Sequence, residues 1–283
     1  MKRKNTIYEI CIYAILIIAF LIVIFPLISV FMASFKTNAE ILTSAEKVFP
    51  KKLTFENYVL AWNSENFRVG QMLFNSIWYS LTSVVILLFL SSVAGYVFAR
   101  GEFKGKKIIF AIFTALMFVK LGPITIYPQF ETLGRIKLSS SLWGLIVMEC
   151  FSMPIIEVYL VRGFVNSLPK ALDEAARIDG CSFTGTFFRI ILPLLKPVMI
   201  TIGMLGFNGS WNNYLYPTLF TMSRPDQQTL IVGIMALKNS GESASAWNLM
   251  FSATVIAIIP VLTAFILGNK HITQGMMAGA VKG

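Results

Sequence analysis

Long uninterrupted runs of apolar residues dominate this chain. A helix needs about 20 apolar residues to cross the hydrocarbon core of a bilayer, and six runs are long enough or nearly so. They are Ile10 to Phe35, Met72 to Ala99, Ile108 to Tyr127, Leu142 to Val161, Leu194 to Tyr216 and Leu249 to Leu267. Runs of this length without alternation are not those of a transmembrane β-barrel. We therefore predict an all-α integral membrane protein with six transmembrane helices.

Composition supports a membrane protein, since 56% of the 283 residues are hydrophobic and 13% are charged. The first apolar run follows Met1-Lys2-Arg3-Lys4 and holds 26 residues, against roughly 7 to 15 in the core of a signal peptide. We expect it to remain in the membrane as a helix. Four prolines are predicted to interrupt spans, either around a pathway or as simple kinks in a bundle; they are Pro26, Pro123, Pro154 and Pro260.

Basic residues between the runs indicate the orientation. With the N-terminus in the cytoplasm, the inner segments and Lys196 hold 14 of the 24 Lys and Arg residues. This modest excess favours cytoplasmic N- and C-termini by the positive-inside rule. Residues 1–283 are then expected to form one transmembrane domain.

The net charge of +10 is spread over short stretches between apolar runs, so it does not indicate nucleic-acid binding. Cys11, Cys150 and Cys181 have no spacing typical of a disulfide framework or a thiolate metal site. The single histidine, His271, excludes a metal centre built on histidines. We therefore predict no metal and no cofactor bound by this chain.

The polar segment between the fourth and fifth runs predicts two short helices. Pro169 suits a first helical turn, Asp173 and Glu174 lie toward its positive end, and Gly180 suits its stop. A second helix is expected from near Ser182 toward Pro193. The apolar face of the first helix needs cover, either from a partner or from the spans of the same chain.

This segment contains Glu174-Ala175-Ala176, three residues, Gly180, nine residues, then Ile190-Ile191-Leu192-Pro193. The pattern resembles the EAA motif of ABC importer permeases. The resemblance implies a type I importer permease fold, a core at 72–268, a cytoplasmic coupling loop at 163–193 and a cytoplasmic tail at 269–283. It also implies that the loop docks on a separate ATPase. The coupling residues would be Asp173, Glu174, Ala175, Ala176, Asp179, Gly180, Ile190, Leu192 and Pro193.

The final segment, Gly275 to Gly283, and the stretch Ser210-Trp211-Asn212 resemble the carbohydrate branch of this family. The resemblance implies a second homologous permease, an ABC ATPase dimer, an extracellular or periplasmic sugar-binding protein, and a place in the bacterial cytoplasmic membrane. The outer segment 217–248 would touch the binding protein or form a plain solvated loop. No stretch matches the phosphate-binding pattern G-x-x-x-x-G-K-[ST], so ATP and Mg²⁺ are expected on the partner ATPase.

Aromatic rings and amides that could line a sugar pathway cluster near the end of the fifth run. They are Asn208, Trp211, Asn212, Asn213 and Tyr214. The alternatives are an interfacial aromatic belt and amides that bridge helices. Lys120 and Glu149 are charged groups at membrane depth; they could form an ion pair between adjacent spans, or an unpaired Lys120 could bind an acidic sugar.

Three other function classes compete with a sugar importer. An ion-coupled carrier would need an ionisable relay or inverted repeats, for which Glu149, Glu157 and Lys120 are a thin basis. A membrane enzyme would need a nucleophile, a base and an orienting group, and no such arrangement is recognisable. An ABC importer of a non-sugar substrate remains open, because the sugar assignment rests on resemblance.

Overall fold

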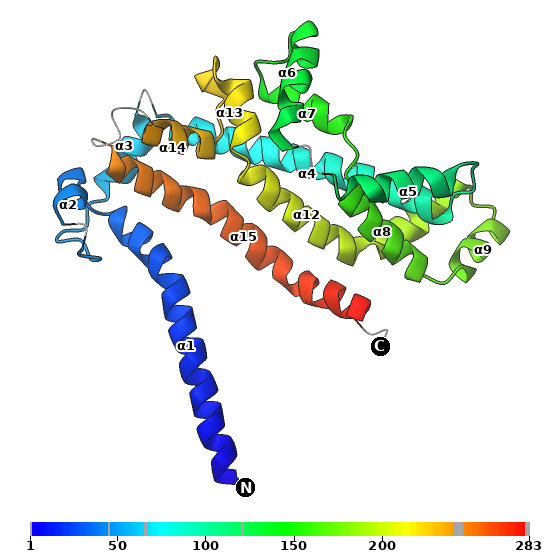
Figure 1. Ribbon diagram of the computed structural model, residues 1–283, viewed down its shortest axis with the longest axis horizontal. Helices are drawn as coiled ribbons and strands as arrows, with labels where there is room; N and C mark the ends of the chain where they lie inside the picture. Colours follow the sequence, from blue (N-terminus) through cyan, green and yellow to red (C-terminus); the bar gives the residue numbers. More distant parts are fainter. Residues whose placement is uncertain (1, 45, 65–66, 120–121, 240–245, 281–283) are drawn as a thin grey trace. The chain divides into compact units, whose positions relative to one another are not determined.

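The computed structural model describes residues 2–44, 46–64, 67–119, 122–239 and 246–280 of the 283, and every regular element among them is helical. Figure 1 shows the helices in sequence colours, and the chain divides into two compact units. The first contains the described residues of 1–71 and 233–259. The second contains those of 72–232 and 260–283.

Three helices are long and apolar enough to cross a membrane alone. They lie within α1 (Lys2–Ala33), α4 (Val69–Arg100) and α15 (Trp247–Ala280), at Tyr8–Ala33, Val69–Arg100 and Trp247–Gly268. The first, second and sixth predicted spans are therefore confirmed as helices. Pro26 and Pro260 lie inside α1 and α15, so neither proline ends its helix, and the alternative that they kink their spans stays a prediction. Each proline removes only one backbone donor, and the remaining hydrogen bonds keep the helix continuous.

Two further spans are possible if each counts as a bent pair of helices, which gives up to five. The helices α7 (Leu142–Cys150) and α8 (Ile155–Ser167) meet at 42°, with Pro154 as the N-cap of α8. The prediction that Pro154 interrupts its span is confirmed. The segment Phe183–Leu194 meets α12 (Lys196–Trp211) at 75°.

The third predicted span, Ile108 to Tyr127, is not one continuous helix. The helix α5 (Lys106–Leu116) holds 11 residues, and the 3₁₀ turn η1 (Gly122–Thr125) precedes α6 (Ile126–Arg135). Gly122 has a φ of +58° and Pro123 follows it, which is turn chemistry rather than helix chemistry. The apolar run is therefore divided at its Gly-Pro pair.

Short helices connect these elements. The first unit also holds α2 (Asn38–Thr43), α3 (Glu56–Asn63) and most of α14 (Leu230–Asn239). The second holds α9 (Ala171–Ile178), α10 (Phe183–Thr186), the π segment η2 (Phe187–Ile191), α11 (Leu192–Leu194), α13 (Leu215–Thr221) and η3 (Pro225–Gln227). The segment predicted as an outer loop at 217–248 thus contains helical turns.

In the first unit, a buried asparagine joins the end of α1 to the start of α15. The Asn57 side chain is 2% exposed, and its Nδ2 donates to the carbonyls of Ser34 and Lys36, each at 2.8 Å. Its Oδ1 accepts from Asn248 Nδ2 at 2.9 Å. A buried amide with all these partners stabilises one arrangement of the three segments.

The second unit has two apolar clusters. One is formed by Tyr96, Val161, Val165, Phe187, Ile191, Leu195 and Ile202, and the other by Tyr79, Leu133, Leu142, Leu145, Ile146 and Phe220. At Gly95, α4 and α8 approach so closely that an added Cβ would lie 2.6 Å from the Val161 Cβ. A small residue at this crossing permits the close helix packing found in membranes.

Candidate functional site

The helix α9 carries the first half of the predicted coupling motif and ends as expected. It begins at Ala171 with Lys170 as its N-cap, so Pro169 lies just before the helix and not in its first turn. Asp173 and Glu174 lie in its first turn, where the helix dipole favours carboxylates. Gly180 has a φ of +78°, and the backbone N–H of Cys181 donates to the Ala176 carbonyl at 2.8 Å. This is the left-handed stop that a glycine allows.

The two faces of α9 differ in exposure. Ala176 is 2% exposed, whereas Glu174, Ala175, Asp179 and Gly180 are exposed in this chain. Ile178 is 86% exposed and extends the outer face. Apolar and small side chains therefore lie on the face of α9 that the chain itself does not cover.

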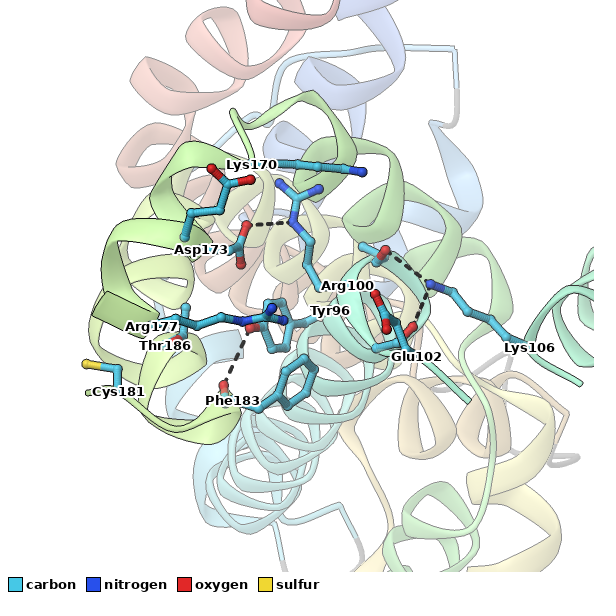
Figure 2. Close-up of a pocket in the computed structure, with 13 residues that line it drawn as sticks. Tyr96, Arg100, Glu102, Lys106, Lys170, Asp173, Arg177, Cys181, Phe183 and Thr186 are labelled. Carbon is cyan, nitrogen blue, oxygen red and sulfur yellow. Dashed lines mark hydrogen bonds and ion pairs between the residues drawn. The ribbon is translucent and has the colours of Figure 1, made fainter. Parts of the chain in front are cut away.

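The opposite face is held by an ion pair that the sequence did not reveal. Arg100 Nε at the end of α4 lies 2.8 Å from Asp173 Oδ2, and the two side chains are only 9% and 15% exposed. Arg100 Nη2 also donates to the Leu168 carbonyl at 2.8 Å. Figure 2 shows the guanidinium reaching from α4 toward the Asp173 carboxylate. One arginine thus fixes α9 and the turn before it to the end of a long helix.

A pocket of about 410 Å³ lies beside this pair, lined by α4, α9 and the residues after each. Lys106 Nζ, at its rim, donates to the carbonyls of Ala99 and Gly101. Burial lowers the pKa of Lys106, and the nearby Arg162 adds to this effect. The Tyr96 ring packs on the Phe183 ring, with 4.6 Å between the two ring centroids. The pocket combines basic and acidic groups with an aromatic floor.

The second helix of the predicted loop begins as expected. Ser182 caps α10 by accepting a hydrogen bond from the Gly185 N–H at 3.1 Å. Of the later motif residues, Ile190 and Leu192 are half-buried against the cluster around Ile191, and Pro193 is exposed. In this chain the later half of the motif therefore contributes to internal packing.

Three of the five residues predicted to line a sugar pathway near the end of the fifth run are exposed, and they are Asn208, Asn212 and Tyr214. Trp211 is 2% exposed and stacks on Phe207 with centroids 5.5 Å apart. Asn212 Nδ2 donates to Asn208 Oδ1 at 2.9 Å, so these two amides bind each other. Asn213 is half-buried and Tyr214 is 36% exposed.

Glu149 lies at the end of α7, where its Oε1 accepts a hydrogen bond from the Tyr79 hydroxyl at 3.2 Å. The predicted partner, Lys120, lies outside the described residues, so this ion pair stays a prediction. Tyr79 is not among the residues predicted from the sequence, although a signal was present. Ser76, Tyr79, Ser80 and Ser83 recur at helical spacing in an apolar run, which indicates a polar stripe on one face of α4.

Near the start of α4, the turn around η3 is tied down by side chains. Asn75 Nδ2 donates to the carbonyls of Asp226 and Gln228, and the Ser76 hydroxyl accepts from the Leu230 N–H at 2.8 Å. Arg224 and Asp226 form an exposed ion pair at 3.0 Å. This charged turn is held on the long helix by neutral hydrogen bonds.

Known proteins resemble the chain over nearly its full length. The arabinooligosaccharides transport system permease protein AraQ of Bacillus subtilis (strain 168) is 31% identical over 280 residues, which cover 98% of this chain and 97% of AraQ. The galactooligosaccharides transport system permease protein GanQ of the same organism is 32% identical over 286 residues, which cover 100% of this chain and 99% of GanQ.

Solved structures share the fold. A chain of a bacterial ABC transporter involved in the import of the acidic polysaccharide alginate matches with a TM-score of 0.79 at 23% identity, covering 95% of this chain and 97% of that one. Residues 72–277 match the family described as binding-protein-dependent transport system inner membrane component. With more than half of its length matched, the chain belongs to this family of transport system membrane components.

Proposed function

We propose that this chain is the membrane-spanning subunit of an ATP-driven ABC importer that moves a sugar or oligosaccharide into a bacterial cell. Relatives named for arabinooligosaccharides and galactooligosaccharides support the substrate class. The structural neighbour that imports alginate handles an acidic polysaccharide. The comparisons therefore leave the identity and the charge of the sugar open.

The proposed topology has six spans with both termini in the cytoplasm. The long helices, the two bent pairs and the segment from α5 to α6 would supply the six crossings. The distribution of Lys and Arg supports this orientation. It places α9 and the residues 163–193 on the cytoplasmic side, within a core at 72–268, and the segment 269–283 beside them as a cytoplasmic tail.

The uncovered outer face of α9 is the observation that carries the coupling role. Ile178 and Ala175 expose apolar surface that a partner must cover, and Glu174 offers a carboxylate to a basic or backbone donor. Asp173 would serve differently from the other motif acids, since its carboxylate anchors α9 to Arg100. We infer that α9 is the coupling helix that seats on an ABC ATPase dimer.

In this mechanism, ATP and Mg²⁺ bind to the ATPase, and closure of its dimer displaces α9. The displacement reaches α4 through the Arg100 to Asp173 ion pair and reaches α12 through the segment Phe183–Leu194. A second homologous permease completes the pathway, and a sugar-binding protein docks on the outer side. No covalent chemistry takes place in this chain.

Purification of the tagged chain in mild detergent, with mass spectrometry of the proteins that accompany it, tests this function. Wild type should bring down an ATPase and a second permease. Gly180→Trp should lose the ATPase, because a bulky side chain would stand at the end of α9. Gly122→Trp is the matched control, since both glycines have a positive φ, +78° and +58°, and an added Cβ at either meets nothing within 4 Å.

Ile178→Asp gives a second variant that leaves the fold of this chain intact, because the side chain is 86% exposed. It should weaken ATPase recovery as Gly180→Trp does. Recovery of a stable, folded chain without any ATPase, together with sugar uptake that follows an ion gradient, would contradict the proposal. That outcome would favour the ion-coupled carrier.

A further inference from the structure

A small polar cavity lies where the span formed by α7 and α8 is broken. Ser83 of α4, Glu149 of α7, Ser152 in the break and Ser210 of α12 contribute its polar groups. Three aliphatic side chains of α4 and Pro154 complete the lining. Its volume is about 180 Å³. This is room for about six waters, at roughly 30 Å³ each, or for one edge of a sugar ring.

Two polar atoms of this cavity lack a well-aligned hydrogen bond within the part of the chain that the structure describes, although the Ser83 and Glu149 side chains interact with each other. They are Glu149 Oε2 and Ser83 Oγ. Ser83 is 5% exposed, and the other carboxylate oxygen of Glu149, Oε1, already accepts a hydrogen bond from Tyr79. Leaving buried polar atoms without partners is costly, so such atoms in a cavity indicate a site for a polar ligand.

The hydrogen-bonding chemistry of Glu149 Oε2 and Ser83 Oγ suits a sugar. A hydroxyl can donate to Glu149 Oε2, and it can also accept from the Ser83 hydroxyl. The aliphatic side chains of α4 give the C–H face of a ring an apolar wall. Both requirements of a hydroxyl-rich but partly apolar ligand are therefore met at one place.

The charge of the lining narrows the ligand class. Glu149 is the charged residue among the described lining residues, and none of these is Lys or Arg. A carboxylate in a site of low dielectric constant repels a second anion strongly. We propose that this cavity binds the hydroxyl-bearing edge of a neutral sugar through Glu149 and Ser83, and that Glu149 discriminates against sugars that carry an acidic group. This inference rests on the proposed function for its sugar, but its electrostatic part can be measured separately.

The electrostatic part is tested with a cysteine placed at the cavity mouth. Ser152→Cys is introduced after Cys11, Cys150 and Cys181 are changed to Ser, in membrane vesicles from cells that carry the whole transporter. Labelling rates are measured with a cationic and an anionic methanethiosulfonate reagent. Glu149→Gln should lower the ratio of cationic to anionic rates by about tenfold, since it removes one unit charge near the thiol.

Tyr79→Phe is the control for collapse of the hydrogen-bond network, because it removes the partner of Oε1 and leaves the Glu149 carboxylate in place. It should keep the wild-type ratio. An unchanged ratio in Glu149→Gln would overturn the inference. An equal fall in Tyr79→Phe and Glu149→Gln would overturn it too, since the effect would then follow from repacking.

Ligand binding is tested by protection of the same cysteine from an uncharged methanethiosulfonate reagent. A mixture of neutral arabino-, galacto- and malto-oligosaccharides should slow labelling several-fold, and oligogalacturonates should not. Ser83→Ala should reduce the protection without changing the charge ratio. Equal protection by neutral and acidic sugars, or none by either, would refute the inference.

Uptake of the same sugars by the same vesicles separates this inference from the proposed function. Uptake of neutral sugars without protection of Ser152→Cys refutes the cavity assignment alone. Absence of uptake for every sugar, together with the absence of a co-purifying ATPase, refutes the proposed function. If the ratio of cationic to anionic labelling rates still depended on Glu149 in that case, only the electrostatic part of the inference would be retained.

Discussion

Loss of the carboxylate at Asp173 should loosen α9 without unfolding the rest of the chain. Asp173→Asn keeps the size of the side chain but leaves Arg100 without its ion-pair partner. The Arg100 side chain is only 9% exposed, so its charge would stay buried. Removing one member of a buried ion pair costs about 3 to 5 kcal/mol. We expect about 3 kcal/mol here, because the Asp173 side chain keeps 15% of its surface in solvent and Arg100 retains the Leu168 carbonyl.

Hydrogen exchange of the α9 amides measures this loss directly. A tenfold change in an equilibrium corresponds to about 1.4 kcal/mol, so 3 kcal/mol is roughly a 150-fold increase in local opening. The peptide covering Ala171–Ile178 should therefore exchange about two orders of magnitude faster in Asp173→Asn. Peptides from α12 should change little, because opening of α9 is local.

A matched control is the exposed pair of Arg135 and Glu131 on α6, which lies at 3.1 Å with side chains 78% and 53% exposed. Exposed pairs contribute about 0.2 to 1 kcal/mol, so Glu131→Gln should change exchange of its own helix by a few-fold at most. Similar effects at both sites would show that burial of the Arg100 pair adds nothing.

The double variant Arg100→Gln with Asp173→Asn completes the cycle. Because the double variant leaves no unpaired charge, it should lie closer to wild type than either single variant. Strictly additive losses, or normal exchange in Asp173→Asn, would refute the view that this ion pair anchors α9. In the assembled importer, the same single variant should lower sugar uptake per ATP hydrolysed.

Gly95→Val should destabilise the second unit by about 1 to 3 kcal/mol through overpacking against Val161. Gly163→Val is the control, because its added Cβ meets open space. Thermal unfolding in detergent compares the two variants. Asn57→Ala should cost about 2 to 4 kcal/mol, since three hydrogen bonds are lost from a side chain 2% exposed, and proteolysis of the first unit should report it. Burial raises the pKa of Tyr58 above its ordinary value of 10.0. Its neutral form therefore stabilises the fold fully below pH 10, and this stability should fall as the pH rises above 10. This loss of stability above pH 10, measured from unfolding followed by fluorescence, should be smaller in Tyr58→Phe than in wild type.

The long spans were predictable because apolar composition alone decides them. The predicted runs 10–35, 72–99 and 249–267 lie within three residues, at both ends, of the apolar spans Tyr8–Ala33, Val69–Arg100 and Trp247–Gly268. The third predicted span is not one continuous helix, because counting apolar residues ignored the turn chemistry of Gly122 and Pro123. Pro26 and Pro154 differ in outcome although both are prolines in apolar runs, because local backbone hydrogen bonds decide whether a helix continues.

The two short helices between the fourth and fifth predicted spans were also predictable, because their caps are local in sequence. Ser182 and Gly180 were placed correctly from residue type alone. The ion pair of Arg100 with Asp173 and the hydrogen bond of Tyr79 with Glu149 join residues far apart in sequence. Such contacts depend on how α4 packs against later helices, which periodicity does not determine.

The length of α1 has a consequence for the lipid around the protein. Its apolar part holds 26 residues, and none of its most apolar window is buried inside the chain. At 1.5 Å per residue it is about 39 Å long, against roughly 30 Å for the hydrocarbon core of a bilayer. Such an excess is relieved by tilting the helix or thickening the lipid around it. The angle at which α1 crosses the membrane is therefore tuned by acyl-chain length, and a thicker bilayer should hold the helix more upright.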